Sequence, residues 1–241
     1  MRDEIIYPRK GKNEPSIGPV ALMVAMEGDM ALVRRSMGIQ GRAVCRILTS
    51  RLYNATCCHQ EIAVVGPMLG APYAVMILEK LIVLGAKRIL FLGWCGSIQD
   101  GVQIADFVVP DYAVIGEGTS GYYPLNNDCP RASDGIVKAI EKSLELRSIL
   151  IHKGPVWTTD AVYRETKQKV LLLKSEGVLG VDMEVSALFT VAIFRRVEIG
   201  ALLVVSDELG ALRWRPGFSI KKFERSREIA AEVIPAICQE L

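Results

Sequence analysis

A length of 241 residues, 50% of them hydrophobic and 23% charged, fits one α/β domain with a large buried core and excludes a disordered chain. The formal charge of +2 is too small to indicate a nucleic-acid-binding surface. No apolar stretch is long enough to span a membrane, and the N-terminus does not resemble a signal peptide. We therefore expect no nucleic-acid partner, no membrane partner and a cytoplasmic location.

The cysteines and histidines give little support for a metal site. The six cysteines show no C-x-x-C spacing, and His59 and His152 are the only histidines. We expect no bound metal, and we predict that the cysteines are reduced thiols.

Strand and helix patterns alternate through the first half of the chain. In order, we predict a strand over 20–26, a helix over 29–37, strands over 43–53 and 61–65, a helix over 73–84, and strands over 87–92 and 107–115. Pro110 within the last strand predicts an edge position or a bulge.

The second half begins with a loop over 116–133 that is rich in Gly, Pro, Asn and Asp. After it we predict a helix over 136–146, a strand over 148–156, helices over 164–176 and 185–196, a strand over 199–205, and a closing helix over 219–240 that Pro235 should kink. The alternation favours a sheet with helices on its faces. We find no repeat and no linker, so residues 1–241 are predicted to form a single domain.

Four short stretches lie at predicted strand ends, where ligands bind in open α/β sheets. They cover residues 25–29, 93–96, 181–184 and 205–208. In the second stretch an apolar strand runs into the glycine turn FLGWCGSIQDG, and Trp94 lies between Gly93 and Cys95. A turn of this kind usually presents backbone N–H groups to a ligand, so an indole at its centre is unexpected.

Five motifs in order carry a resemblance to a known family. They read VGPMLGAP, GAKRILFLGWCGSIQDGVQIADFVV, WTTDAVYRET, GVDMEVSALFTVA and LLVVSDEL. The chain thereby resembles the nucleoside phosphorylases of the purine and uridine type and their hydrolytic relatives, the methylthioadenosine/adenosylhomocysteine nucleosidases. The resemblance implies a single-domain, three-layer-like α/β sandwich whose central sheet is mixed, partly barrel-like and flanked by helices. It also implies a homo-oligomer, either a dimer or a hexamer.

The resemblance implies roles for three residues near the C-terminal half of the chain. Met183 and Glu184 match the pair that grips ribose, and Asp207 matches the acid that assists the departing purine, where protonation makes the base a better leaving group. Each acid also has a structural interpretation. Glu184 could be a first-turn helix carboxylate, and Asp207 could cap the following turn.

Other residues are expected to line the same pocket. Trp157 lies where the family places an aromatic ring against the base or sugar, although a core tryptophan is the competing interpretation. Cys95 and Gly96 lie in the glycine turn, and Ser206 lies in the Ser-Asp motif. All three are predicted to contact the substrate.

Two positions depart from the phosphorylase pattern. Phe91 and Trp94 stand where phosphorylases of this family carry an arginine and a Ser or Thr that hold phosphate. Neither ring can replace a guanidinium fork or a hydroxyl in binding a dianion. One alternative is a substrate with a large apolar 5′-group, which both rings would suit.

The N-terminal motif AMEGDM resembles the opening of the nucleosidases, Ala-Met-Glu-Glu-Glu-Val. In those hydrolases the third carboxylate activates water, and Asp29 matches that position. A solvated acid at a helix start is the alternative interpretation.

We predict an enzyme that cleaves the N-glycosidic bond of a small-molecule nucleoside, with a purine weakly preferred over uridine because of Asp207. No metal or organic cofactor is expected, and phosphate is a candidate co-substrate. Phosphorolysis is placed first because the longer stretch of similar sequence favours it. Two alternatives stay open: a phosphate-independent nucleosidase that uses Asp29 and accepts a 5′-modified nucleoside, and a nucleoside-binding protein without activity.

Overall fold

The computed structural model describes residues 4–125 and 129–241. Its strands are β1 (Val20–Val24), β2 (Cys45–Ile47), β3 (Ser50–Cys57), β4 (Gln60–Gly66), β5 (Arg88–Ser97), β6 (Phe107–Gly116), β7 (Ile151–Thr159), β8 (Gly180–Asp182), β9 (Glu198–Glu208) and β10 (Arg215–Pro216). Its helices are α1 (Glu27–Ser36), α2 (Ala71–Leu84), α3 (Asp134–Glu145), α4 (Lys167–Ser175), α5 (Val185–Arg195) and α6 (Lys221–Gln239), with short 3-10 turns η1 (Thr119–Tyr122) and η2 (Val162–Arg164).

The strands form one mixed sheet in the order β10-β9-β6-β7-β8-β5-β1-β4-β3-β2, with a further pairing between β9 and β5. That pairing closes β5, β8, β7, β6 and β9 into a barrel, and β1, β4, β3 and β2 continue from β5 as an open extension. Parallel and antiparallel pairs both occur within the barrel, as between β5 and β9 and between β6 and β9. The predicted mixed, partly barrel-like sheet is confirmed.

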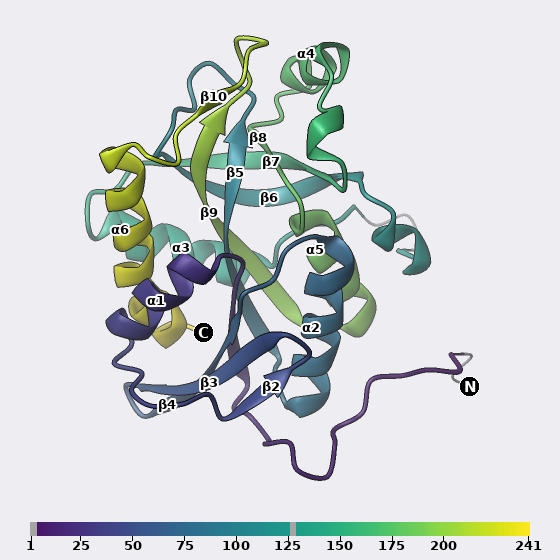
Figure 1. The fold of residues 1–241 in the computed structure, drawn as a ribbon, viewed down its shortest axis with the longest axis vertical. Helices are drawn as coiled ribbons and strands as arrows, with labels where there is room; N and C mark the ends of the chain where they lie inside the picture. Colours follow the sequence, from purple (N-terminus) through teal and green to yellow (C-terminus); the bar gives the residue numbers. More distant parts are fainter. Residues whose placement is uncertain (1–3, 126–128) are drawn as a thin grey trace.

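Helices cover both sides of the sheet, as predicted. In Figure 1, α1 and α6 lie together on one side, and α2 and α5 lie together on the other. The strand β1 is buried at every position, and α5 is buried at eight of its eleven positions, which agrees with the continuous apolar pattern of both segments.

The predicted strand over 43–53 is wrong as a single strand. The chain turns back at Leu48, whose φ is +56°, so β2 and β3 form an antiparallel hairpin. The short strands β8 and β10 were not predicted, because two or three residues carry no measurable periodicity. The predicted loop over 116–133 contains η1, and its residues 126–128 lie outside the described residues.

Pro110 causes a bulge rather than marking an edge. The register between β6 and β7 shifts between Pro110 and Ala113, while β6 lies between β9 and β7 in the sheet. Pro235 stands inside α6, which continues to Gln239. None of the helices in the described part of the chain is long and apolar enough to cross a membrane.

The strand predicted over 87–92 extends through the glycine turn to Ser97. This happens because β9 pairs with the whole of β5, with a register shift between Cys95 and Gly96, and because β8 pairs with Gly96 and Ser97. The FLGWCG stretch is therefore part of the barrel wall, and its side chains point either into the core or toward the barrel end.

Candidate active site

A cavity of about 490 Å³ lies at the end of the barrel. Its lining comes from the ends of β5, β8 and β9, the start of α5, and the segments around η2 and β10: Ala25, Met26, Leu69, Trp94, Cys95, Gly96, Val162, Tyr163, Glu165, Val181, Asp182, Met183, Glu184, Ser206, Asp207, Leu209, Trp214 and Phe218. The cavity brings together seven of the residues predicted to act on substrate: Trp94, Cys95, Gly96, Met183, Glu184, Ser206 and Asp207.

Glu184 lies directly before α5, and the residue is only 4% exposed. It forms part of the cavity wall. The backbone N–H of Gly70 donates a hydrogen bond of 2.6 Å to Glu184 Oε1. Gly70 has a φ of +84°, a conformation that L side chains rarely adopt, so a glycine here allows the N–H to point at the carboxylate. The contribution of Gly70 was not predicted, although VGPMLGAP was recognised as a motif.

Asp182 holds the start of α5 in place. Its Oδ2 accepts hydrogen bonds of 2.7 Å from the N–H groups of Glu184 and Val185, and its Oδ1 accepts one of 2.6 Å from Thr158 Oγ1. These bonds satisfy donors that a helix start leaves without an intrahelical partner. The helix-start role thus belongs to Asp182, two residues before the predicted ribose-binding acid.

The two neighbouring acids are both buried and therefore hold their protons more tightly than usual. Burial raises the pKa of Asp182 to about 6, against the opposing hydrogen bonds. Burial, followed by the charge of Asp182, raises the pKa of Glu184 to about 8. Carboxyl groups with such pKa values, placed together in a cavity, are characteristic of functional sites.

Asp207 lies near the end of β9, on the opposite side of β5 from β8. Its Oδ1 accepts a hydrogen bond of 2.6 Å from Ser206 Oγ, and its Oδ2 accepts one of 2.9 Å from the Trp214 indole. A Cβ atom on Gly96 would lie 2.9 Å from Asp207 Oδ2, so the glycine leaves the room that this carboxylate occupies. Trp214 was not singled out from the sequence, and nothing in its local pattern marks it.

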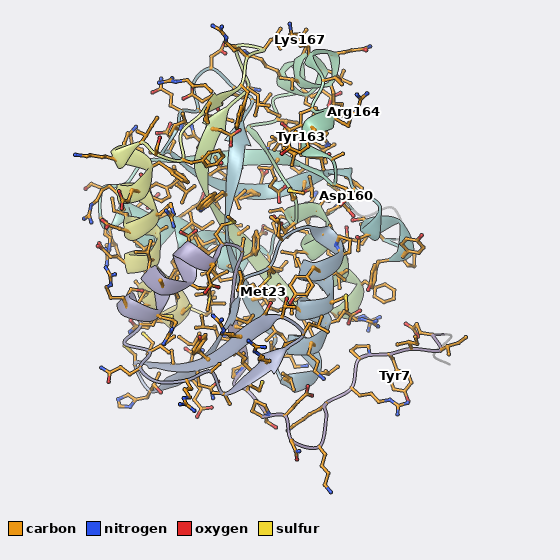
Figure 2. All side chains as sticks on the ribbon, in the orientation of Figure 1. Tyr7, Met23, Asp160, Tyr163, Arg164 and Lys167 are labelled. Atoms are coloured by element: carbon orange, nitrogen blue, oxygen red, sulfur yellow. The ribbon has the colours of Figure 1, made fainter. Side chains whose placement is uncertain are left out.

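A further acid, Glu165, enters the cavity from the segment between η2 and α4. Figure 2 shows Tyr163 and Arg164 in η2, just before this segment, at the same end of the molecule as the ends of β5 and β9. Burial, followed by the charge of Asp207, raises the pKa of Glu165 to about 7. Glu165 lies in the motif WTTDAVYRET, but the sequence did not indicate which of its side chains would reach the cavity.

Trp94 is part of a buried charged network beside the cavity. Its indole Nε1 donates to Asp29 Oδ2 at 2.7 Å, and Arg227 Nε donates to Asp29 Oδ1 at 2.6 Å. The Arg227 guanidinium also lies 4.9 Å from the centre of the Trp94 ring. Burial raises the pKa of Asp29, while Arg227 and the Trp94 hydrogen bond oppose this effect.

Asp29 does not line the cavity, and both of its oxygens already accept hydrogen bonds. The alternative interpretation of a solvated acid is wrong, because Asp29 is 2% exposed. Instead, the carboxylate connects α1 to α6 through Arg227 and to β5 through Trp94.

Phe91 and Trp157 also lie outside the cavity lining. Phe91 is fully buried in the main core beneath Gly93. Trp157 packs in a smaller cluster with Ile98, Val170 and Leu173. The placement of both rings is that of core residues, as the competing interpretation of Trp157 stated, and neither reaches the substrate space in this structure.

The cavity lining is acidic. It contains the carboxyl groups of Glu165, Asp182, Glu184 and Asp207, and no Lys, Arg or His occurs among the described residues that line it. Within the ranges 4–125 and 129–241, no group of three or more His, Cys, Asp or Glu side chains is arranged to hold a metal ion. The six cysteines are free.

A family model described as the phosphorylase superfamily matches residues 19–241, which include every residue of this cavity. The chain belongs to the phosphorylase superfamily. Membership agrees with the resemblance carried by the five sequence motifs, and it covers all ten strands of the sheet.

Curated relatives of this superfamily member include two bacterial proteins. The chain is 32% identical over 126 residues to the DeoD-type purine nucleoside phosphorylase of Jannaschia sp., a match covering 52% of this chain and 54% of that protein. It is 28% identical over 152 residues to the DeoD-type 1 enzyme of Shewanella oneidensis, covering 62% and 64%. The matches therefore span between half and two thirds of the length of these relatives.

Solved structures share the fold along nearly the whole chain. The uridine phosphorylase of Vibrio fischeri superposes with a TM-score of 0.82 at 23% identity, covering 98% of this chain and 99% of that one. The purine nucleoside phosphorylase of Toxoplasma gondii, in complex with immucillin-H, gives a TM-score of 0.82 at 20% identity, covering 99% and 97%. At these identities the likeness concerns the fold alone.

Proposed function

We propose that the protein cleaves the N-glycosidic bond of a nucleoside, with a purine nucleoside as the preferred substrate. The observation that carries the proposal is that Glu184, at the start of α5, and Asp207, near the end of β9, line one cavity. Membership of the phosphorylase superfamily and similarity to DeoD-type purine nucleoside phosphorylases support it.

The two acids suit the charges that the reaction develops. Breaking a ribosyl C–N bond leaves positive charge on the sugar and electron density on the base, as in other glycoside cleavage. Glu184 would accept hydrogen bonds from the ribose hydroxyls while Met183 packs against the sugar, and Asp207 would lie at the base. Trp94, Cys95, Gly96 and Ser206 would complete the wall. No step of this chemistry requires a metal or an organic cofactor.

Phosphate is the proposed acceptor of the sugar. Two observations support this choice: the superfamily to which the chain belongs, and the engagement of both Asp29 oxygens by Trp94 and Arg227. A water-activating base needs a free lone pair directed at the substrate space, and Asp29 lies outside the cavity lining.

Hydrolysis is a second candidate, favoured by the charge of the cavity. A phosphate dianion placed among four carboxyl groups, with no cation among the described lining residues, would be repelled, whereas water would not. Trp94, Phe218 and Trp214 form an aromatic wall, with ring centres 6.2 Å apart for Trp94 and Phe218 and 6.3 Å apart for Trp214 and Phe218. This wall suits an apolar 5′-substituent.

One experiment separates these candidates. Purified protein is incubated with inosine, adenosine, uridine or methylthioadenosine, with and without phosphate, and the base and sugar products are identified. Phosphorolysis predicts a ribose 1-phosphate product and strict dependence on phosphate, while hydrolysis predicts free ribose at a rate that phosphate does not change. The Glu184→Gln variant is the matched control for contaminating activity. Nucleoside binding in a thermal-shift assay without turnover of any substrate would indicate a binding protein.

We also propose that the protein forms a homo-oligomer. Apolar side chains remain exposed at the β2–β3 turn and on α2, where Leu48 is 53% and Met76 is 52% exposed. Light scattering after size-exclusion chromatography tests this, and a monomer at micromolar concentration would contradict it.

A further inference from the structure

Trp214 is a tryptophan whose place in the structure is not explained by burial. It is 60% exposed, whereas Trp157 is 4% exposed within a small core cluster. An indole stabilises a fold mainly through the apolar area that it buries, so an exposed one contributes little in this way. Trp214 nevertheless lines the cavity, together with Asp207. Its position points to a role at the cavity rather than in the core.

The pairing of β10 with β9 holds Trp214 beside Asp207. The two strands are antiparallel, with Pro216 opposite Asp207, and Figure 1 shows β10 next to the end of β9. The backbone N–H of Gly217 donates a hydrogen bond of 2.9 Å to Ser206 O, which is a second anchor between the same segments. Trp214 lies two residues before Pro216, so backbone pairing sets its distance from Asp207.

The Asp207 carboxylate receives one hydrogen bond at each oxygen. Trp214 Nε1 donates to Oδ2 at 2.9 Å, and Ser206 Oγ donates to Oδ1 at 2.6 Å. Donors on both oxygens restrict rotation of the carboxylate plane. An indole N–H can only donate, so this bond is strongest when Asp207 is negatively charged. No Lys, Arg or His among the described lining residues could take its place.

We propose that Trp214 is a positioning residue for Asp207, whose carboxyl group it fixes toward the departing base. This inference rests on the proposed cleavage of a nucleoside, in which Asp207 assists that base. As the bond between the sugar carbon and the base nitrogen breaks, its electron pair stays with the base, and the Asp207 carboxyl proton moves to a ring nitrogen. The acceptor, phosphate or water, adds to the sugar carbon. Asp207 is left as a carboxylate stabilised by the Trp214 N–H, and it regains a proton from solvent before the next turnover.

The first test compares inosine with 7-methylinosine, whose base already carries positive charge and leaves without being protonated. Trp214→Phe keeps an aromatic ring in the cavity wall but removes the N–H. We expect its kcat on inosine to fall about 10-fold, which corresponds to one hydrogen bond to a charged group. Its kcat on 7-methylinosine should stay within about threefold of wild type, because that reaction needs no proton from Asp207. A loss of packing alone would act on both nucleosides alike.

Two further variants separate the N–H from the rest of the side chain. In Trp214→His, the imidazole Nε2 is as many bonds from Cβ as the indole Nε1, so the variant can restore the donor at pH 8, where histidine is ordinarily neutral. We expect its kcat on inosine to be about threefold or more above that of Trp214→Phe. Arg213→Gln is the matched control, since Arg213 is exposed in the same turn and does not line the cavity. It should leave both rates unchanged.

A second test determines whether Trp214 acts through Asp207. In Asp207→Asn, kcat on inosine should fall about 100-fold, and adding Trp214→Phe should change it less than about twofold, because the two side chains act as one unit. Three results would overturn the inference: equal losses on both nucleosides in Trp214→Phe, no loss on inosine, or a full further loss in the Asp207→Asn background. If the wild type cleaves no nucleoside, the proposed function fails as well, whereas an active wild type with an unaffected Trp214→Phe variant overturns this inference alone.

Discussion

The indole of Trp94 and the carboxylate of Asp29 are hydrogen-bonded at 2.7 Å, and this contact explains why an indole occupies the glycine turn of β5. A buried carboxylate needs donors, and the turn supplies one from its side chain. Arg227 supplies the other donor and lies over the ring face. A serine or threonine at residue 94 would be too short to reach the Asp29 carboxylate. It would also offer no ring face for the Arg227 guanidinium.

Replacing Trp94 by Phe should destabilise the protein by about 1–2 kcal/mol, because one Asp29 oxygen loses its donor while it stays buried. Urea denaturation at pH 7 measures the change. Trp214→Phe is the matched control, since that indole also donates to a carboxylate but is 60% exposed. A larger loss in the control than in Trp94→Phe would contradict the account of this network.

Replacing Arg227 by Met should cost about 3–5 kcal/mol, because Asp29 becomes a buried charge without its cation. Arg227 lowers the pKa of Asp29, so the removal of Arg227 raises that pKa further. The destabilisation should therefore grow as the pH rises through the pKa of Asp29. Denaturation midpoints at pH 4 and pH 8 measure this trend. The double variant Asp29→Asn with Arg227→Met should recover most of the loss, and the exposed Arg225→Met should show little effect.

Glu184→Gln should make the fold more stable and abolish turnover. The folded-state pKa of Glu184, about 8, lies above its ordinary value of 4.5, so the contribution of this residue to stability is present below about pH 4.5 and is lost as pH rises toward 8. The glutamine side chain does not ionise, so the variant does not lose this stability. The difference in the free energy of unfolding between the variant and wild type should grow by about 1–3 kcal/mol between pH 5 and pH 8. The exposed Glu145→Gln is the control for general charge effects. An advantage independent of pH would show that Glu184 does not titrate in this range.

Gly70→Ala should lower stability by about 1 kcal/mol, because an alanine must adopt the left-handed φ of +84° that presents the N–H to Glu184. No atom lies within 4 Å of the added Cβ, so the cost comes from the backbone alone. Activity should fall as well, since any relaxation of the backbone moves the donor away from Oε1. Gly101→Ala meets open space without a positive φ and should be neutral in both thermal stability and kcat/KM.

Much of the architecture was predictable because its long elements carry a clear period. The apolar pattern of β1, β9 and α5 located three buried elements, and the predicted boundaries of α2 and α3 differ from the observed ones by about two residues, a typical error. The hairpin at Leu48 was missed because residues 43–53 alternate without a Gly or Pro to mark the turn. Barrel closure depends on the pairing of β5 with β9, which are about a hundred residues apart, and no local pattern reports it.

The candidate site was predictable only where a motif names its residues. Glu184 and Asp207 stand in motifs, and the structure places both in the cavity lining. Glu165 and Trp214 owe their positions to packing between distant segments, so their local sequence says little about them. Asp182 stands in the same motif as Glu184, but its role at the start of α5 was not predicted. Asp29 and Trp94 were noticed separately, but their partner Arg227 lies 198 residues from Asp29, and only the fold reveals the network.

Closure of the barrel also limits how the two sides of the cavity can move. The backbones of β8 and β9 are both hydrogen-bonded to β5, so the walls beside Glu184 and Asp207 cannot move apart without breaking strand pairing. The segment around Tyr163 and Glu165 has no strand pairing of its own, and it is anchored through the bond from Gly118 N–H to Asp160. A molecule that leaves the cavity by a movement of its wall would therefore displace this segment rather than the paired strands.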